Sequence, residues 1–546
     1  MYELSVTAWQ AHVATLPTLP EAWLATAKRL GGAMAAVDSV GKPLSHHRFA
    51  TAVLRLAAVI RRRNAEQNLG ILLPASSAGA IVNMAALAAG KTVVNINFTS
   101  SEAAIANALR KADIRCVYTS SRFLEKLRKK GIDLGAVFAD IEVVHLEALL
   151  QGMGKLGSLL LFGLVVTLPT PLLRALFLGR AAREDTAAIL FSSGSEGEPK
   201  GVELSHANIM ANLTQVSDVL DTDPDDRIMA TLPLFHAFGL TATTFMPLVE
   251  GIPMICHPDP TDALNVAKAI SRHRATVLCG TSTFLRLYAR NQRVHPLMLE
   301  SLRIVVAGAE RLNPEVRDAF SLKFGKTIYE GYGTTETTPV ASVNLPDRLD
   351  TTHWKVQIGS KVGTVGMPLP GTSFRIVDPV SLQAVPPGED GLILIGGVQV
   401  MKGYLGDPER TAASIVELDG QRWYKTGDKG HLDSDGFLTI VDRYSRFAKI
   451  GGEMISLSVV EQQARAAIAD DAAELVAVNL PDDKKGEQIV LLTTAAIDTE
   501  QLRQALLARG CNPLTIPAQV RRVETVPTLG SGKTDFGAAK RLAAAP

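Results

Sequence analysis

Short apolar runs alternate with segments of helical periodicity in the first quarter of the chain, and this alternation limits the possible folds most strongly. The runs at 68–73, 92–97 and 116–119 predict strands, and the segments at 77–89 and 101–111 between them predict helices. Strands that are joined through helices pair in parallel, and the helices then cover the faces of the sheet. The sequence therefore predicts an α/β fold whose parallel sheets are sandwiched by helices.

The segment 21–63, ahead of these runs, is predicted to be helical. Apolar residues recur at helical spacing from Phe49 to Ile60. The three arginines that follow, Arg61 to Arg63, predict a solvated helix end rather than a docking patch.

A loop of small and polar residues follows the apolar run at 187–191. It contains Ser192, Ser193, Gly194, Ser195, Glu196, Gly197, Glu198, Pro199 and Lys200. Small side chains let backbone N–H groups face an anion, and the lysine adds a positive charge, so the loop suits a polyphosphate. A Walker A loop is excluded, because no serine or threonine follows Gly201. A helix is predicted from His206, with Ser205 as its N-cap.

Three downstream strings place polar groups after predicted strands. His236 stands between aromatic residues, and Gly308, Ala309 and Glu310 follow the run at 304–306. The third string begins at Ile328 and contains Gly331, Tyr332, Gly333, Thr334, Thr335 and Glu336. Tyr332 can stack on a base, Thr335 can bind a phosphate oxygen and Glu336 can hold Mg²⁺. A histidine between aromatics is by itself more typical of a core residue.

Two further features lie near the C-terminus. Asp428, read as the end of a strand, is suited either to accept ribose hydroxyl groups or to cap a turn. Lys533 is the only lysine of a glycine-rich turn at 527–536. This turn is not a Walker A, because Pro527 occupies the place of its first glycine. An exposed surface turn is the simpler interpretation of Lys533 in isolation.

Taken together and in this order, the strings resemble the adenylate-forming superfamily of acyl- and aryl-CoA synthetases, luciferases and peptide-synthetase adenylation domains. The similarity extends over residues 21–540. Within the superfamily, segments 191–202, 329–336, 446–461 and 529–536 look most like the acyl-[acyl-carrier-protein] synthetase part of the bifunctional acyltransferase/synthetase that reacylates lysophospholipids. The resemblance implies a large AMP-binding domain (1–445) and a small mobile α+β C-terminal domain (446–546).

The resemblance also implies the roles of the site residues. Lys533 would be the catalytic lysine, His236 would lie between the phosphates and the carboxylate pocket, and Glu336 would hold the metal. The nucleotide would be bound by Ser192, Ser193, Gly194, Ser195, Gly197, Lys200, Gly308, Ala309, Glu310, Gly331, Tyr332, Gly333, Thr335, Asp428 and Arg443. Arg446 would be the hinge, and Lys449 and Gly452 would face the thiol arm of the acceptor. Glu196 and Arg446 depart from the broad superfamily pattern, and the same branch shares both departures.

The reaction implied has two steps. A fatty carboxylate attacks the α-phosphorus of ATP, with Mg²⁺, to give acyl-AMP and pyrophosphate, and a thiol then displaces AMP. The expected acceptor is acyl carrier protein, and CoA is the second candidate acceptor. An oxidoreductase of luciferase type and a non-catalytic subunit that binds acyl groups or nucleotides are less expected functions of the same chain.

Charge and hydropathy constrain the partners. Lys and Arg number 56 against 55 Asp and Glu, so no net field would recruit nucleic acid. The four widely spaced cysteines indicate buried, reduced thiols of a cytoplasmic protein.

The segment 156–178 has no charged residue up to Leu173, and Lys155 and Arg174 flank this stretch. Pro169 and Pro171 predict a helix break near Thr167. The segment is expected to pack on the protein's own core, to contact the inner face of a membrane peripherally or, least expected, to span it.

Overall fold

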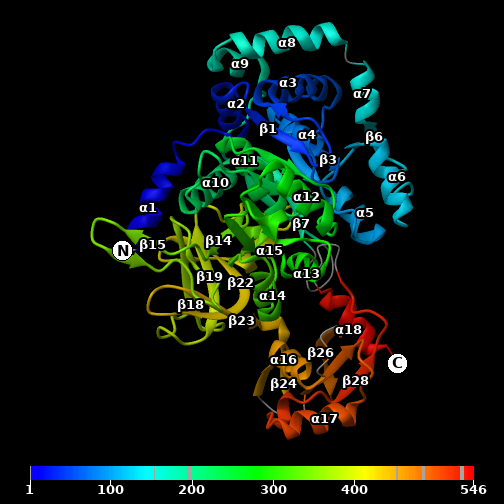
Figure 1. Cartoon of the computed structure of the whole chain (residues 1–546), viewed down its shortest axis with the longest axis vertical. Coiled ribbons are helices and arrows are strands. Elements are labelled where there is room, and N and C mark those ends of the chain that lie inside the picture. Colours follow the sequence, from blue (N-terminus) through cyan, green and yellow to red (C-terminus); the bar gives the residue numbers. More distant parts are fainter. Residues whose placement is uncertain are drawn as a thin grey trace.

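A computed structural model of the chain describes residues 2–152, 154–192, 199–450, 453–468, 470, 473–482, 486–528 and 534–545, with the side chains from residue 8 onward. Most of the chain forms a large α/β body, and the last hundred residues form a smaller unit at one end of the long axis (Figure 1). The predicted boundary at 445/446 falls within the short 3₁₀ turn η4 (Tyr444–Arg446).

A nine-stranded sheet forms one half of the body. In spatial order its strands are β17 (Met367–Pro368), β14 (Val340–Val343), β13 (Ile328–Gly333), β12 (Ile304–Ala307), β11 (Val277–Gly280), β9 (Ile228–Ala230), β10 (Met254–Cys256), β1 (Met34–Asp38) and β2 (Leu44–Ser45). The six strands from β13 to β1 pair in parallel, and the outer strands are antiparallel.

A seven-stranded sheet forms the other half. Its order is β20 (Gly403–Tyr404), β8 (Lys200–Ser205), β7 (Thr186–Ser192), β4 (Thr92–Asn95), β3 (Asn68–Leu72), β5 (Cys116–Thr119) and β6 (Glu142–His145). The strands from β7 to β6 are parallel, and β8 and β20 are antiparallel.

Five layers result from the alternation of side chains on the two sheets. In most of the parallel strands, odd and even residues enter different hydrophobic clusters, because successive side chains point to opposite faces. The central cluster holds α2 (Leu19–Leu30), α3 (His46–Arg63), α4 (Ser77–Ala88), α10 (His206–Leu220), the π-helix η1 (Phe238–Phe245) and α11 (Met246–Glu250). The outer layers are α12 (Ala263–His273), α13 (Ser282–Arg290), η2 (Pro296–Leu299) and α14 (Pro314–Phe324) on one side, and α5 (Glu102–Lys111) and α6 (Ser121–Lys129) on the other. The predicted α/β class is confirmed.

A third, antiparallel sheet completes the body. It contains β18 (Thr372–Val377), β19 (Gly391–Gly397), β22 (Gln421–Leu432), β21 (Ile415–Leu418) and β23 (Leu438–Arg443). The body also contains α1 (Tyr2–Val13), α7 (Leu146–Gly152), η3 (Thr335–Thr337), the hairpin β15 (Arg348–Asp350) and β16 (Lys355–Gln357), and α15 (Pro408–Ser414).

The C-terminal unit has its own sheet and its own core. The sheet consists of β25 (Glu453–Ser456), β24 (Phe447–Ile450), β27 (Gly486–Thr493), β26 (Leu475–Asp482) and β28 (Gln519–Arg522). The other elements are α16 (Leu457–Ile468), α17 (Thr499–Ala508), η5 (Pro513–Thr515) and α18 (Phe536–Ala544). Its two hydrophobic clusters contain only residues from Ala448 onward.

Several sequence-based boundaries are wrong. The stretch 34–45 is not helical, because β1 and β2 lie at the edge of the nine-stranded sheet and main-chain pairing with β10 outweighs local propensity. Residues 454–467 are typical of one helix in the sequence, but residues 454–456 belong to β25, which pairs with β24, and α16 begins at Leu457. Asp428 lies inside the long strand β22 and not at a strand end. Of the four cysteines, Cys511 is only partly buried.

The apolar segment forms two helices, α8 (Lys155–Thr167) and α9 (Thr170–Phe177), and the predicted break at Thr167 is confirmed. Among the described residues, no single helix is long and apolar enough to cross a membrane. The helices α7 and α8 together pass this test by length and composition only, and they are bent by 89° relative to each other.

Candidate active site

Three of the predicted strings meet beside the ends of β12 and β13. These strands are parallel neighbours, so their carboxyl ends share one edge of the sheet, where ligands bind in open α/β folds. Gly308 follows β12, and a Cβ atom there would lie 3.2 Å from Phe238 Cε1 and 3.7 Å from the Gly331 carbonyl oxygen. Phe238 of the His236 string therefore contacts the end of β12, and Gly308 in turn lies beside the Gly331 carbonyl oxygen of β13.

Glycine is required within the His236 string. A Cβ at Gly239 would lie 2.1 Å from the Pro233 carbonyl oxygen, so a side chain at that position would push the π-helix away. His236 itself is half-buried, its ring centroid is 4.9 Å from that of Phe235, and its main-chain N–H donates to Pro233 O at 3.1 Å. The π-helix is a feature that the sequence reasoning did not identify.

Glu310 is engaged with the protein. Its carboxylate accepts from the Thr283 N–H and, at 3.2 Å, from Thr283 Oγ1 at the start of α13. Ala309 before it has φ +71°, so the chain turns sharply after Gly308. Gly308 and Ala309 thus present backbone at the strand end, while the Glu310 side chain fixes the turn.

Glu336, Tyr404 and Lys200 form a polar cluster in the candidate site. Glu336 is 7 % exposed, and its Oε1 accepts a hydrogen bond from the Tyr404 hydroxyl at 2.8 Å. The Lys200 ammonium lies 5.5 Å from the centre of the Tyr404 ring, on the opposite strand of the β8–β20 pair. Tyr404 therefore joins the lysine of the predicted phosphate-binding loop to the predicted metal carboxylate.

The carboxylate of Glu336 fits a Mg²⁺ site of the open kind. Oε1 is held by Tyr404, and no described residue donates a hydrogen bond to Oε2. No group of three or more histidine, cysteine, aspartate or glutamate side chains in the described part of the chain is arranged to hold a metal. Mg²⁺ commonly binds one or two carboxylates and takes its other ligands from water and substrate phosphates. Glu336 would be such a carboxylate.

Asp428 is held by two donors. The Tyr332 hydroxyl donates to its Oδ2 at 2.5 Å, and Arg443 Nε donates to its Oδ1 at 3.1 Å. Asp428 and Arg443 are directly opposite residues of β22 and β23, which brings their side chains within reach. Burial, followed by the nearby Asp428 carboxylate, raises the pKa of Tyr332 well above its usual range, so the phenol stays protonated as a donor.

The charges of Glu336 and Asp428 both act on Tyr424. Tyr424 is buried on β22, and its pKa is raised by burial and then by the negative charges of Glu336 and Asp428 beside it. Gly333 ends β13, and Thr335 begins η3, which contains Glu336. A Cβ at Gly333 would lie 1.7 Å from the Pro339 carbonyl oxygen, so this turn requires glycine.

Several predicted residues are not placed by this geometry. Ser193, Gly194, Ser195, Gly197, Gly452 and Lys533 lie outside the described residues. Ser192 ends β7 beside Lys200 on β8. Lys449 is exposed on β24, and its main-chain N–H donates to Glu487 at 2.6 Å.

Arg446, the predicted hinge, is bound within the C-terminal unit. Its Nη2 donates to Glu461 Oε1 at 2.7 Å, and its guanidinium carbon lies 4.0 Å from the centre of the Phe536 ring. Burial raises the pKa of Glu461, and the charge of Arg446 opposes that shift. On the other side of the turn, Asp442 Oδ2 accepts from Ser456 Oγ at 2.6 Å and from the Ser458 N–H at 3.2 Å.

Sequence reasoning missed Tyr404, Tyr424 and Asp442 as parts of the site and hinge. Tyr404 ends a run of strands and turns in the sequence, and nothing local distinguishes it from a core tyrosine. Its partner Glu336 is 68 residues away. A long-range pair of this kind is visible only in the folded chain.

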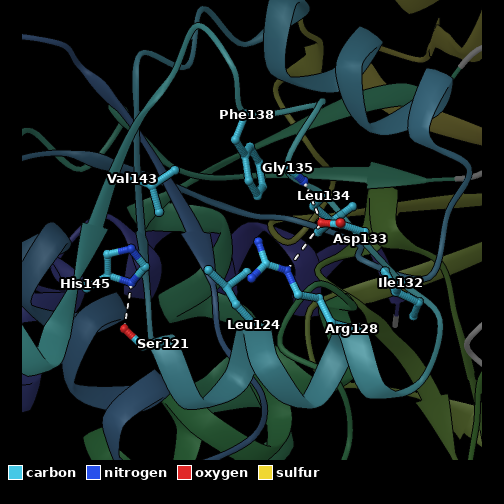
Figure 2. A pocket seen from close by; sticks show the side chains of 10 residues that line it. All are labelled: Ser121, Leu124, Arg128, Ile132, Asp133, Leu134, Gly135, Phe138, Val143 and His145. Atoms are coloured by element: carbon cyan, nitrogen blue, oxygen red, sulfur yellow. Dashed lines mark hydrogen bonds and ion pairs between the residues drawn. The ribbon is translucent and has the colours of Figure 1, made fainter.

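The cavities do not all coincide with these residues. A cavity of about 420 Å³ between α6 and β6 is lined by none of the predicted residues; it contains the Ser121–His145 hydrogen bond of 3.0 Å and the Arg128–Asp133 ion pair of 3.4 Å (Figure 2). A groove of about 560 Å³ has Tyr404 in its wall, with Lys402, Arg422 and Glu203. Of these two cavities, the groove is the one that adjoins the candidate site.

Sequence comparison identifies a matching family and several related enzymes. The model of the AMP-binding enzyme family matches residues 23–405. A feruloyl-CoA synthase of Amycolatopsis sp is 33% identical over 66% of this chain and 70% of that protein. A long-chain-fatty-acid–CoA ligase of Bacillus subtilis is 32% identical over 64% of this chain and 60% of that protein.

Solved structures show the same fold. The o-succinylbenzoate CoA synthetase of Bacillus subtilis, in complex with ATP and magnesium ion, has a TM-score of 0.76 at 23% identity and covers 95% of this chain and 99% of its own. ATP-bound MatB from Rhodopseudomonas palustris also has a TM-score of 0.76 at 23% identity, over 95% of this chain and 98% of its own.

Proposed function

This chain belongs to the family of AMP-binding enzymes, and we propose that within it the protein activates a medium- or long-chain fatty acid and transfers the acyl group to the thiol of acyl carrier protein. The coarser activity is that of an ATP-dependent ligase, which forms a thioester through an acyl-adenylate. The fatty acid as substrate and the carrier protein as acceptor are the proposal.

The observation that carries the proposal is the cluster of Glu336, Tyr404 and Lys200. Phosphoryl transfer asks the protein mainly to position reactants and to neutralise developing charge. The cluster brings a cation and a buried carboxylate to the same tyrosine. The Lys200 ammonium lies 5.5 Å from the Tyr404 ring centre, and the Tyr404 hydroxyl donates to the Glu336 carboxylate at 2.8 Å. Lys200 would meet the phosphates of ATP, and Glu336 would hold Mg²⁺, which would neutralise phosphate charge.

The remaining residues would hold the nucleoside. Gly308 and Ala309 present main chain without large side chains, so a flat base can lie against them. Asp428 would accept a ribose hydroxyl, since it is already oriented by Tyr332 and Arg443. When bound, Mg²⁺ would neutralise charge on the phosphate oxygens. Lys533 would be delivered by the C-terminal domain and would stabilise the charge on the reacting oxygens.

The thioester step requires a different set of groups. Rotation about Arg446 would withdraw Lys533 and bring the face with Lys449 and Gly452 to the adenylate. Lys449 is exposed, as a group that meets an incoming phosphate-bearing arm must be. The contacts of Asp442 with Ser456 and Ser458, across the turn, would restrain this rotation.

Two observations bear on the substrates. A relative of 32% identity is named a long-chain-fatty-acid–CoA ligase, which supports a fatty acid and equally supports CoA as the second candidate acceptor. For acyl carrier protein, an acidic partner, the support is the resemblance of the motifs and the basic pair Arg521 and Arg522 on β28.

The test measures both steps separately. Pyrophosphate release is followed for fatty acids of increasing chain length and, as a control, for ferulate. Thioester yield is then compared with CoA and with acyl carrier protein at equal thiol concentrations. Faster release with fatty acids and a higher yield on the carrier protein support the proposal. A preference for ferulate refutes the fatty acid, and a higher yield on CoA replaces the carrier protein by CoA.

A further inference from the structure

The helix α8 is apolar on both of its faces. Its inner side chains Leu161 and Val165 belong to the central hydrophobic cluster, as does Leu173 of α9. Its outer side chains are also apolar: Leu156, Leu159 and Leu160 are 71 %, 67 % and 63 % exposed. A surface helix ordinarily carries polar residues on its outer face, so an outer face of leucines indicates a binding surface.

The exposed face continues onto the next helix. Leu164 and Val166 of α8 and Leu172 and Leu176 of α9 are also exposed, and no charged residue occurs from Leu156 to Leu173. We call the seven exposed residues Leu156, Leu159, Leu160, Leu164, Val166, Leu172 and Leu176 the outer apolar face.

The two helices are fixed to the body. Lys28 Nζ donates to the carbonyl oxygens of Val165 and Val166, at 2.7 and 2.9 Å, near the end of α8. Arg55 Nη2 donates to the Gly154 carbonyl oxygen at 3.2 Å before its start. The α8 part of the outer apolar face is therefore anchored to the body at both ends of the helix.

The surroundings of this face are basic. The helix α3, which supports α8, carries the arginines Arg48, Arg55, Arg61, Arg62 and Arg63 and no acidic residue. Lys155 and Arg174 stand at the two ends of the uncharged stretch. Two of these cations are compensated, Arg63 by Glu142 and Arg174 by Glu21. The exposed Arg48, Arg61, Arg62 and Lys155 form no ion pair with any residue that the structure describes.

We propose that the outer apolar face docks on the surface of an anionic lipid bilayer, with the arginines of α3 and Lys155 meeting the lipid headgroups. Helices with an apolar face that is flanked by cations lie in the interface plane of a membrane, and basic residues near that surface add attraction to anionic lipids. A second copy of the chain is a poorer occupant. A twofold contact would set the same arginines against their own counterparts, where like charges repel.

The place of the face in the molecule agrees with this use. Figure 1 shows α8 and α9 at one end of the long axis and the C-terminal unit at the opposite end. Docking through α8 would leave that unit clear of the bilayer. The inference holds for either acceptor thiol, since it rests on α3, α8 and α9 alone.

The experiment measures co-flotation of the full chain with vesicles. Pure phosphatidylcholine vesicles are compared with vesicles that contain phosphatidylglycerol, each at low and at high salt. The expected result is binding to the anionic vesicles that weakens with salt. The variant Leu156→Gln/Leu159→Gln/Leu160→Gln should lower the partition coefficient at least tenfold. The matched control Leu297→Gln/Leu322→Gln changes exposed leucines on η2 and α14 and should bind as the wild type.

A second variant tests the role of the α3 arginines, and pyrophosphate release and sedimentation serve as controls. Arg48→Gln/Arg61→Gln/Arg62→Gln should lose the preference for anionic vesicles. All variants should retain pyrophosphate release with a soluble fatty acid, which shows that they fold. The proposal is overturned if the wild type floats with neither vesicle, or if the leucine variant binds as tightly as the wild type. It is also overturned if sedimentation shows a dimer that the leucine substitutions dissociate while vesicle binding is absent.

Discussion

The hydrogen bond from Tyr404 to Glu336 allows a sharp test of the site. Tyr404→Phe removes one hydroxyl and leaves the ring beneath Lys200 in place. Both partners are buried, at 5 % and 7 % exposure, so water does not replace the lost donor readily. A hydrogen bond to a charged group contributes about 1.5–3 kcal/mol. At about 1.4 kcal/mol per factor of ten, we expect kcat/KM for ATP to fall about tenfold to a hundredfold.

The assay is ATP–pyrophosphate exchange at saturating fatty acid, repeated over a range of Mg²⁺ concentrations. The loss should be largest at low Mg²⁺, because Tyr404 acts by positioning the carboxylate that binds the metal. A purely structural role would lower stability without this dependence on Mg²⁺.

Tyr118→Phe is the matched control. Tyr118 is fully buried in β5, and its hydroxyl donates to Asn64 Oδ1 at 2.7 Å, away from the site. Its loss should lower the free energy of unfolding by about 1 kcal/mol and leave the exchange kinetics unchanged. If Tyr404→Phe retains wild-type kcat/KM at every Mg²⁺ concentration, Tyr404 does not position Glu336 and the reasoning fails.

Three other outcomes are expected. Lys533→Ala should slow acyl-adenylate formation by about a hundredfold or more, while thioester formation from added acyl-AMP persists; unchanged pyrophosphate exchange would contradict its catalytic role. Arg446→Ala leaves the carboxylate of Glu461 without its cation and should lower the free energy of unfolding by about 3 kcal/mol. Denaturant titrations measure this, and an unchanged unfolding midpoint would argue against the ion pair. Burial raises the pKa of Asp259, but hydrogen bonds and the ion pair with Lys130 outweigh it and lower the pKa to about 2. The resulting stability is present above the unfolded pKa of about 4 and is lost as the pH falls from about 4 to about 2. In a series of thermal melts at different pH, Asp259→Asn should therefore make the melting temperature fall less steeply between about pH 4 and pH 2. An unchanged fall would show that Asp259 does not contribute.

The sequence by itself determined the elements whose signals are local. Alternating strand and helix patterns fixed the α/β class, and the strands at β3, β5 and β12 were predicted within one residue. The Ser205 cap is confirmed, as its Oγ accepts from the Asn208 N–H at 3.0 Å. The break between α8 and α9 is confirmed as well. Periodicity, capping and proline act within a few residues, so they can be read without a structure.

Only the tertiary structure decided which distant groups meet. β1 is a strand because it pairs with β10, more than two hundred residues later. Tyr404 reaches Glu336, and Asp428 reaches both Tyr332 and Arg443, only because β20, β22 and β23 assemble around the strand ends. The outer apolar face shows the same limit. Hydropathy marks the whole segment as apolar, but which leucines are buried and which remain exposed depends on how α8 packs against α3.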